Sequence, residues 1–314
     1  MKIFIEIPTW LGDAVMATPA IENIIATYPT SKLTIMGSFV STKLFLYHPN
    51  VEKLIVDDSK KRGFRYYNLY KLAKSSEIEY DLAFSFRKNF TTKFLLNFIK
   101  AKKRFIYKRY DKNLEKHQVI RYNDFVNKSL KINTKAGKLK IYPDPQIQTS
   151  IKIKKLLGIN PGATYGSAKR WYPQEFANIC QELSDRFDIV IFGGPGETDI
   201  ALDIQKQLEN SNISNFQNLA GKTSVEELIV KISTLDLFIT NDSGPMHVAA
   251  AFDVPTISIF GPTRFKETSQ WMNPNGKLIR KELECSPCMK RVCPLGHHDC
   301  MKLIKAKDVL DVLQ

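Results

Sequence analysis

The chain has 314 residues, of which 43% are hydrophobic and 25% charged, as in an ordinary soluble globular protein. This length predicts two domains. No apolar run approaches the roughly 20 residues of a membrane-spanning helix. The short apolar N-terminal stretch contains Glu6, so it predicts a first β-strand rather than a secretory signal, and therefore a cytoplasmic protein.

The net charge of +14 lies entirely in the first half. Residues 1–150 carry 27 lysines and arginines against 13 aspartates and glutamates, whereas the remaining residues carry 19 of each. Such asymmetry indicates that the first half meets a polyanion: nucleic acid, an anionic membrane, or a phosphorylated or acidic substrate. A merely soluble basic surface is the alternative.

In the first half, short apolar runs alternate with amphipathic stretches. In chain order we expect a strand at 3–7, a helix at 13–28, strands at 33–36, 54–56 and 82–86, a helix at 91–100, and a strand at 104–107. This rhythm predicts a parallel sheet with helices on both faces.

The pattern restarts after residues 142–155, a polar segment with two prolines that is typical of a linker. We expect strands at 156–160, 189–192, 237–240 and 256–260, and helices at 173–187, 225–234, 246–252 and 305–313. The prediction is two doubly wound α/β domains, 1–150 and 151–314, with the final helix able to pack back on the first. Ligands of such sheets bind outside the carboxyl ends of the strands, so an interdomain cleft is expected.

The loop "PTWLGDAVMATP", residues 8–19, follows the first strand. Gly12 allows a tight turn, and Asp13 falls at the predicted start of a helix. Asp13 is therefore either a helix N-cap or a carboxylate placed to act as a general base.

The loop "NPGATYGSAKRWYP", residues 160–173, follows the first strand of the second half. Its glycines, the hydroxyls of Thr164 and Ser167, and the pair Lys169–Arg170 suit a phosphate or diphosphate. The spacing matches neither a Walker loop nor a GxGxxG fingerprint. A solvated basic surface loop is the alternative.

Two further loops follow predicted strands. In "FGGPGETD", residues 192–199, Glu197 either caps a helix start or accepts hydrogen bonds from ribose hydroxyls. In "TNDSGPMHVAAA", residues 240–251, the helix start and Ser243 suit an anion, whereas the charge of Asp242 suits uncharged sugar hydroxyls. His247 lies near one turn into that helix and is either structural or a neighbour of the same ligand.

Five segments together resemble glycosyltransferase family nine, the ADP-heptose:lipopolysaccharide heptosyltransferases, and most closely the heptosyltransferase II branch. They are "LGDAVMATPAI", "NPGATYGSAKRWYP", "FGGPGE", "NLAGKTSVEELI" and "TNDSGPMHVAAAFDVPTISIFGPT", spread in order over almost the whole chain. The resemblance implies a GT-B fold with the donor nucleotide mostly on the second domain. It also implies inverting, metal-independent transfer of heptose from ADP-heptose to the lipopolysaccharide inner core, without a cofactor.

The resemblance also implies roles for individual residues. Asp13 matches the general base, and Lys169 matches the lysine that neutralises the leaving diphosphate, for which Arg170 is a second candidate. The residues implied for donor binding are Thr164, Tyr165, Lys169, Arg170, Glu197, Asp242, Ser243, Gly244, Met246 and His247.

The basic first half suits an anionic glycolipid acceptor at the cytoplasmic face of the inner membrane. In "FSFRKN", residues 84–89, Arg87 and Lys88 are candidate acceptor contacts, and the loop of Lys60, Lys61 and Arg62 is a second candidate. The alternative is that the side chains of either set only contact solvent.

The motif "CSPCMKRVCPLGHHDC" places Cys285, Cys288, Cys293 and Cys300 near the end of the chain, with His297 and His298 between them. It suggests a zinc site, although the spacing matches no common zinc finger. Buried reduced thiols are the alternative, and no metal is assigned.

Three other functions compete. The first is transfer by a heptosyltransferase I or another family member, onto a different core acceptor or from another nucleotide-sugar. A nucleic-acid-binding protein would need an RNA or DNA module, which the sequence does not show, so no nucleic-acid partner is predicted. A Rossmann oxidoreductase would need GxGxxG spacing, which is missing after both opening strands.

Overall fold

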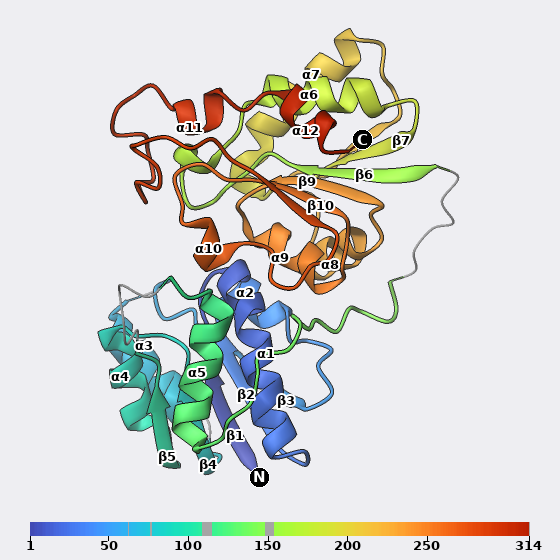
Figure 1. Cartoon of the computed structure of the whole chain (residues 1–314). Helices are drawn as coiled ribbons and strands as arrows, with labels where there is room; N and C mark the ends of the chain where they lie inside the picture. Colours follow the sequence, from blue (N-terminus) through green and yellow to red (C-terminus); the bar gives the residue numbers. More distant parts are fainter. Residues whose placement is uncertain (62, 76, 109–114, 148–153, 314) are drawn as a thin grey trace. The chain divides into compact units, whose positions relative to one another are not determined.

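The computed structural model describes residues 1–61, 63–75, 77–108, 115–147 and 154–313 (Figure 1). The chain divides into two compact units, Met1–Pro143 and Asp144–Gln314, and the division falls within the segment expected as a linker. Each unit is built on one parallel sheet, which confirms the predicted α/β class. None of the described helices combines the length and apolarity needed to cross a bilayer.

The sheet of the first unit has the strand order β3-β2-β1-β4-β5. Its strands are β1 (Lys2–Glu6), β2 (Lys32–Gly37), β3 (Val51–Val56), β4 (Tyr80–Ser85) and β5 (Ala101–Ile106). The chain moves outward from β1 to β3 and then returns to pair β4 with the other side of β1, where Glu6 lies opposite Ser85. The switch point, where ligands bind in such sheets, is therefore between β1 and β4.

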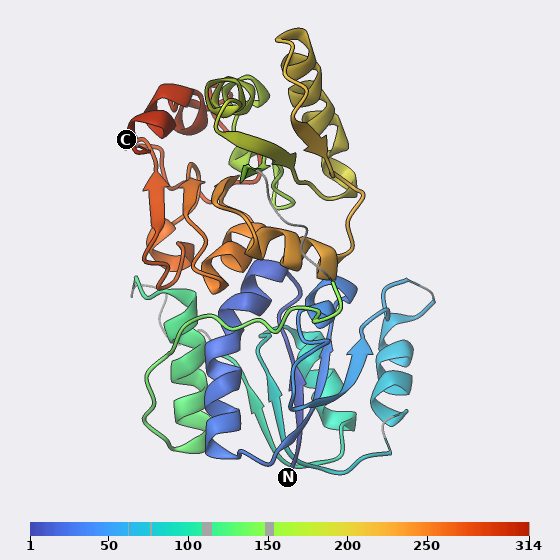
Figure 2. The ribbon, with the colours of Figure 1, turned by 90° about the vertical axis from the view of Figure 1, so that its right-hand side faces the viewer.

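Helices cover both faces of this sheet (Figure 2). On one face, α1 (Leu11–Thr27) packs against α5 (Gln118–Leu130), and Phe84 and Phe86 meet the Phe125 ring of α5 edge-on. On the other face, α3 (Arg65–Lys74) packs against α4 (Phe90–Phe98) over a core that includes Phe4 and Tyr80. The short α2 (Phe39–Lys43) follows β2.

The sheet of the second unit has the order β11-β10-β9-β6-β7-β8. Its strands are β6 (Lys155–Asn160), β7 (Phe187–Ile191), β8 (Phe216–Asn218), β9 (Leu237–Asn241), β10 (Thr256–Ile259) and β11 (Gly276–Ile279). The edge strands β8 and β11 are absent from the sequence expectations because short edge strands with polar residues show no apolar run. The switch point lies between β6 and β9, with Asn160 opposite Thr240.

The helices of the second unit complete its core. They are α6 (Pro173–Leu183), α7 (Thr198–Asn210), α8 (Val225–Ser233), α9 (Gly244–Ala251), α10 (Phe265–Thr268), α11 (Asp299–Lys302) and α12 (Ala306–Asp311), with the 3₁₀ turns η1 (Ser167–Lys169) and η2 (Pro195–Glu197). The closing helix α12 packs on α6, and Val309 is fully buried in the same core as Trp171. The last helix therefore belongs to the core of the second unit.

Candidate active site

Two asparagines end the strands that flank the switch point of the second unit. Asn160 ends β6, and its Nδ2 donates to Ser243 Oγ at 3.2 Å. Asn241 ends β9, its Nδ2 donates to the Pro161 carbonyl at 2.7 Å, and its Oδ1 accepts from the Trp171 amide at 3.1 Å. These bonds fix the loops after β6 and β9 against each other, so the two predicted donor loops form one site.

Lys169 and Asp242 meet at this point. Lys169 Nζ lies 2.6 Å from Asp242 Oδ2 and also donates to the Asp242 carbonyl at 3.3 Å. Thr263 donates to the same carboxylate oxygen at 2.5 Å. The two charged side chains are only 14% and 4% exposed, so their attraction is screened far less than that of a surface pair. Thr263 follows β10 and closes the fifth family-resembling segment, but no role was predicted for it.

Tyr165 holds the Lys169 ammonium from the other side. Nζ lies 4.9 Å from the centre of the Tyr165 ring, and the guanidinium of Arg291 lies 5.4 Å from the same ring. The Tyr165 hydroxyl donates to the Met289 carbonyl at 2.9 Å. The ring therefore joins the loop after β6 to the cysteine-rich segment, and two cations converge on it.

Thr164 and Arg170, in the same loop, differ in their exposure to solvent. Thr164 is exposed. Arg170 has its Nε buried, and that atom finds no hydrogen-bond partner among the described residues. A buried donor of this kind is costly unless a further acceptor satisfies it.

The start of α9 is open to a negatively charged group. Ser243 is the N-cap residue, but its side chain makes no capping hydrogen bond because Oγ engages Asn160 and Thr240. The first amides of α9, from Gly244 onward, therefore lack a side-chain cap and present a positive dipole end. Met246 and His247 follow in the first turn and are 0% and 3% exposed, so both pack inward.

Glu197 ends the turn η2 after β7. Its Oε2 accepts from the Gly194 amide at 2.8 Å, so it caps this turn, as one of the two interpretations of the sequence expected. Glu197 is 8% exposed, and its carboxylate lies against Gly162, where a Cβ would overlap it. Glu197 therefore supports the donor loop as well as its own turn.

Asp13 lies in the first unit, at the carboxyl end of β1. It is the third residue of α1, whose N-cap is Trp10, so the interpretation of Asp13 as an N-cap is wrong. In the first turn of α1, the negative charge of Asp13 instead interacts favourably with the positive end of the helix dipole. Tyr122 of α5 lies near: burial, followed by the Asp13 charge, raises the pKa of the Tyr122 hydroxyl well above its usual value.

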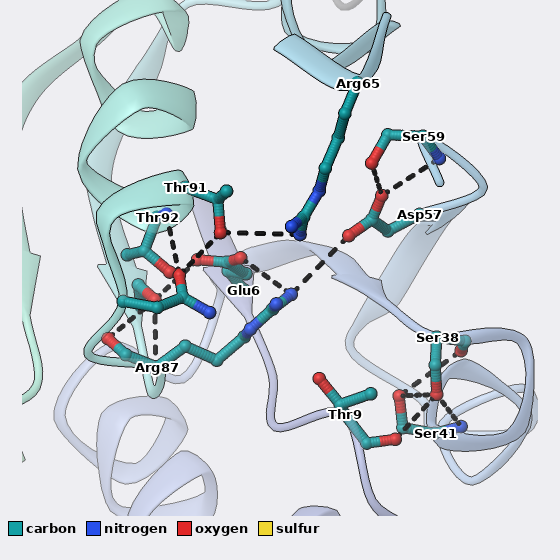
Figure 3. Close-up of polar contacts among 12 residues, drawn as sticks. Glu6, Thr9, Ser38, Ser41, Asp57, Ser59, Arg65, Arg87, Thr91 and Thr92 are labelled. Carbon is teal, nitrogen blue, oxygen red and sulfur yellow. Dashed lines mark hydrogen bonds and ion pairs between the residues drawn. The ribbon is translucent and has the colours of Figure 1, made fainter. Parts of the chain in front are cut away.

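Arg87 reaches from the end of β4 across the switch point of the first unit (Figure 3). Its Nη1 lies 3.0 Å from Glu6 Oε1 and 3.5 Å from Asp57 Oδ2, and Ser85 Oγ donates to Glu6 at 2.6 Å. Burial raises the pKa of the Glu6 carboxyl, while Arg87 and the Ser85 hydrogen bond oppose that shift. With 12% of its side chain exposed, Arg87 is already neutralised by two carboxylates, and its contact with an acceptor stays a prediction.

Arg65 lies beside this network, and no sequence motif marked it. Its Nη2 makes one long contact, 3.5 Å from Thr91 Oγ1, and its buried Nε has no hydrogen-bond partner among the described residues (Figure 3). Lys61 and Lys88 are exposed near the same edge of the sheet. Arg62 lies outside the described residues.

The cysteine-rich segment supports the donor loop. Its four cysteines are free thiols that line one pocket together with His297 and His298. Burial, strengthened by the other three thiols, raises the pKa of Cys300 to about 11. Within the described residues, no group of three or more metal-ligating side chains is placed to hold an ion.

Two backbone contacts tie this segment to Lys169. The Ala168 amide donates to the Arg291 carbonyl at 3.0 Å, and His298 Nε2 lies 2.9 Å from the Ala168 carbonyl. A Cβ at Gly166 would overlap the Arg291 carbonyl, so the two segments are closely apposed. The sequence interpretation treated the cysteines as a separate question and missed this bracing role.

Solved structures with the same architecture extend over the whole chain. The structure of Escherichia coli ADP-heptose lipopolysaccharide heptosyltransferase II matches with a TM-score of 0.80 and 22% identity, covering 100% of this chain and 97% of the other. E. coli heptosyltransferase WaaC with ADP matches with a TM-score of 0.78 and 15% identity, covering 100% and 99%. The fold is therefore GT-B, the two-domain fold of many glycosyltransferases, as predicted.

Sequence relatives identify the family. The profile of glycosyltransferase family 9 (heptosyltransferase) matches residues 66–298. A lipooligosaccharide heptosyltransferase 2 of Campylobacter jejuni is 43% identical over 99% of this chain and 97% of its own length. The E. coli lipopolysaccharide heptosyltransferase 2 is 26% identical over 100% of this chain and 97% of its own length. The chain belongs to glycosyltransferase family 9 and is a glycosyltransferase.

Proposed function

We propose that this protein transfers L-glycero-D-manno-heptose from ADP-heptose to the heptosyl-Kdo-lipid A inner core of lipopolysaccharide or lipooligosaccharide, with inversion and without a metal. The observation that carries the proposal is the Lys169–Asp242 pair beside the open start of α9, in a chain 41–43% identical to two lipooligosaccharide heptosyltransferases 2. A cation and free helix amides at one switch point suit a nucleoside diphosphate leaving group.

The second unit is the donor-binding domain in this proposal. Lys169, with Arg170, stabilises the charge that develops on the departing ADP, which is the role that a divalent ion has in other transferases. The Oδ2 atom of Asp242 is engaged by Lys169 and Thr263, and we assign Oδ1 to hydroxyls of the donor. The remaining donor contacts proposed are Thr164, Tyr165, Glu197, Ser243 and Gly244, and Met246 and His247 support the helix start from the buried side.

The first unit is the acceptor-binding domain in this proposal. Asp13 takes the proton of the acceptor hydroxyl as the new glycosidic bond forms, which makes that hydroxyl a competent nucleophile. Phosphates and Kdo carboxylates of the acceptor meet Lys61, Arg62, Lys88 and Arg87, together with Arg65. Because the acceptor is a membrane lipid, the enzyme works at the cytoplasmic face of the inner membrane as a peripheral protein.

The test is incubation of the purified chain with ADP-heptose and a truncated inner core that carries one heptose, with the product read by mass. We expect a gain of one heptose, unchanged when EDTA is present. A core without heptose serves as the discriminating acceptor, because a heptosyltransferase I would use it instead. A relative named lipopolysaccharide heptosyltransferase 1, from Campylobacter coli, matches only 49% of this chain, so the second-heptose acceptor is favoured. No product from ADP-heptose with either acceptor would refute the proposal.

A further inference from the structure

The helices α3 and α4 carry positive charge and no negative charge. Residues 59–75, which include α3 and the loop before it, contain six lysines and arginines and no aspartate or glutamate. Residues 86–99, which include α4, contain three and again no acid. Because α3 and α4 pack against each other, their charges add on one surface of the first unit.

A row of aromatic rings runs between the same two helices. Tyr66 lies 5.6 Å from Phe64, 6.1 Å from Phe90 and 5.0 Å from Phe94, measured between ring centres. The row continues through Phe98, which is 4.9 Å from Phe94. Tyr66 thus connects the two helix starts into one apolar ridge.

The ends of this ridge protrude. Phe64 and Phe90 are 71% and 69% exposed, and Tyr67 is 54% exposed. On α3 the exposed Lys71 follows Tyr67 by four residues, and on α4 the exposed Lys93 follows Phe90 by three, so each lysine lies on the same side of its helix as the ring. The exposed Lys60 lies in the loop before Phe64. We call this surface the basic-aromatic tip; it consists of Phe64, Tyr67, Phe90, Lys60, Lys71 and Lys93.

Hydrogen bonds hold the parts of the tip together. Asn68 Nδ2 of α3 donates to the Ser59 carbonyl at 3.2 Å, which ties the Lys60 loop to α3. At the start of α4, Asn89 accepts from the Thr92 amide at 2.9 Å, which fixes the turn that presents Phe90. Exposed aromatic rings on an ordered support are therefore a property of this fold.

We propose that the basic-aromatic tip docks on the surface of an anionic lipid bilayer, with Phe64 and Phe90 entering the boundary between headgroups and acyl chains. This inference rests on the proposed function, since the acceptor there is a membrane glycolipid. Protruding aromatic side chains ringed by lysines have the composition of interfacial membrane anchors, and the lysines meet lipid phosphates. Neither residues 59–75 nor residues 86–99 contain an acid, so the surface that they form is strongly positive.

The ring geometry favours lipid over single-stranded nucleic acid. Base stacking needs open ring faces, whereas insertion into a bilayer needs apolar area only. Tyr66 meets Phe90 and Phe94 edge-on and Phe64 at a tilt, and the Lys71 ammonium lies 4.5 Å over the face of Tyr67. Tyr66 and Tyr67 therefore have neighbours where a base would stack, whereas Phe64 and Phe90 offer the exposed apolar area that insertion into a bilayer needs.

The first experiment is co-sedimentation of the full chain with vesicles. One set contains phosphatidylcholine alone and the other equal parts phosphatidylcholine and phosphatidylglycerol. We expect binding to the anionic set, weakened by high salt. Replacing three lysines (Lys60→Gln, Lys71→Gln, Lys93→Gln) should reduce the vesicle affinity about 100-fold, and Phe64→Ser with Phe90→Ser at least about tenfold.

The control replaces exposed residues of the second unit, Leu202→Ser with Lys206→Gln on α7 and Lys231→Gln on α8, and should bind as the unaltered chain does. Thermal melting checks that the tip variants remain folded. Equal binding by the tip variants and the control overturns the proposal. Binding to single-stranded RNA that exceeds vesicle binding and is lost in the tip variants also overturns it, in favour of nucleic acid.

The second experiment separates this proposal from the proposed function. Phe64→Ser with Phe90→Ser should transfer heptose at the normal rate to a deacylated, water-soluble core, but at least about tenfold more slowly to the same core in vesicles. Loss of both rates would place the tip in the active site and overturn the docking proposal. Vesicle binding that depends on the tip, without any heptose transfer by the unaltered chain, would refute the function and leave the docking surface established.

Discussion

Lys169 and Asp242 form an ion pair of 2.6 Å between loops that are 73 residues apart in the chain. The pair lies at the switch point between β6 and β9, and Thr263 gives the same carboxylate a second partner. Because both side chains are largely buried, the pair fixes the position of a cation beside the start of α9. One interaction thereby links the stability of the second unit to the chemistry proposed for it.

Removing the Lys169 ammonium should affect stability as well as transfer. In Lys169→Met, the Asp242 carboxylate stays buried and charged, with the Thr263 hydroxyl still donating to it but no cation beside it. The free energy of unfolding should therefore fall by about 3–5 kcal/mol. Heptose transfer should fall at least about 100-fold, as for loss of a charge-stabilising donor. Urea unfolding followed by tryptophan fluorescence measures the loss of stability, since Trp171 lies buried in the second unit. The mass of the product gives the rate of transfer.

The double variant Lys169→Met with Asp242→Asn separates the two effects. It removes both buried charges, so most of the lost stability should return while transfer stays low. A single variant as stable as the unaltered chain would contradict a stabilising pair. Normal kinetics with ADP-heptose would remove Lys169 from the mechanism.

Arg87 should make the stability of the first unit depend on pH. In Arg87→Met, Glu6 loses the strongest influence that opposes the effect of burial, so the pKa of its carboxyl rises further. A carboxyl whose pKa is higher in the folded than in the unfolded state destabilises the fold increasingly as pH rises through the folded-state value. The loss of stability should therefore be largest at pH 8, about 3–5 kcal/mol, and smaller at pH 5.

Circular dichroism with urea, repeated between pH 5 and 8, measures this dependence. The matched variant Glu6→Gln with Arg87→Met lacks the titrating group, so its stability relative to the unaltered chain should vary less with pH. A deficit in Arg87→Met that grows as pH falls would show that Glu6 is not the group responsible.

Asp13→Asn should retain donor binding and lose transfer. The amide keeps the shape of the side chain but accepts no proton, and loss of a general base lowers rates by about 10²–10⁴-fold. Product mass gives the rate, and calorimetric titration with ADP gives donor affinity. Glu22→Gln, on the same helix and paired with His48, is the control and should turn over normally. Near-normal turnover of Asp13→Asn would end the base assignment.

His298 should matter for donor binding although it lies outside the predicted site. His298→Ala removes the contacts of the ring with the Ala168 carbonyl and with the Tyr172 hydroxyl, at 2.9 and 3.2 Å. At about 1 kcal/mol for each hydrogen bond, the Lys169 loop should loosen and KM for the donor should rise roughly fivefold to thirtyfold. His297→Ala, which is on the same segment but bonds locally to Asp299, should leave KM unchanged. Equal effects of the two substitutions would argue against bracing of the loop by His298.

The class of fold and the places where chemistry is expected were readable in the sequence. Apolar runs and helical periodicity are local properties, so the strands β1, β6 and β9 and the loops after them could be located without a structure. In parallel sheets, the loops that follow strands gather at one edge, where ligands bind. The segments of Asp13, Lys169 and Asp242 could therefore be predicted as parts of a site. The same local rules missed β8 and β11, whose few residues have no distinctive pattern.

Which residues pair with which was decided by the tertiary structure. Strand order is set by long-range packing. In the second unit it places Asn160 and Asn241 on adjacent strands, so that Lys169 meets Asp242. In the first unit it places β4 beside β1, so that Arg87 meets Glu6. The sequence suggested that Arg87 is a cation available to the acceptor, whereas in the structure Arg87 pairs with two carboxylates. The sequence by itself determined the alternation of strands, helices and polar loops, because that pattern is local. The structure decided the pairing of charges, because burial and partners depend on segments distant in the chain.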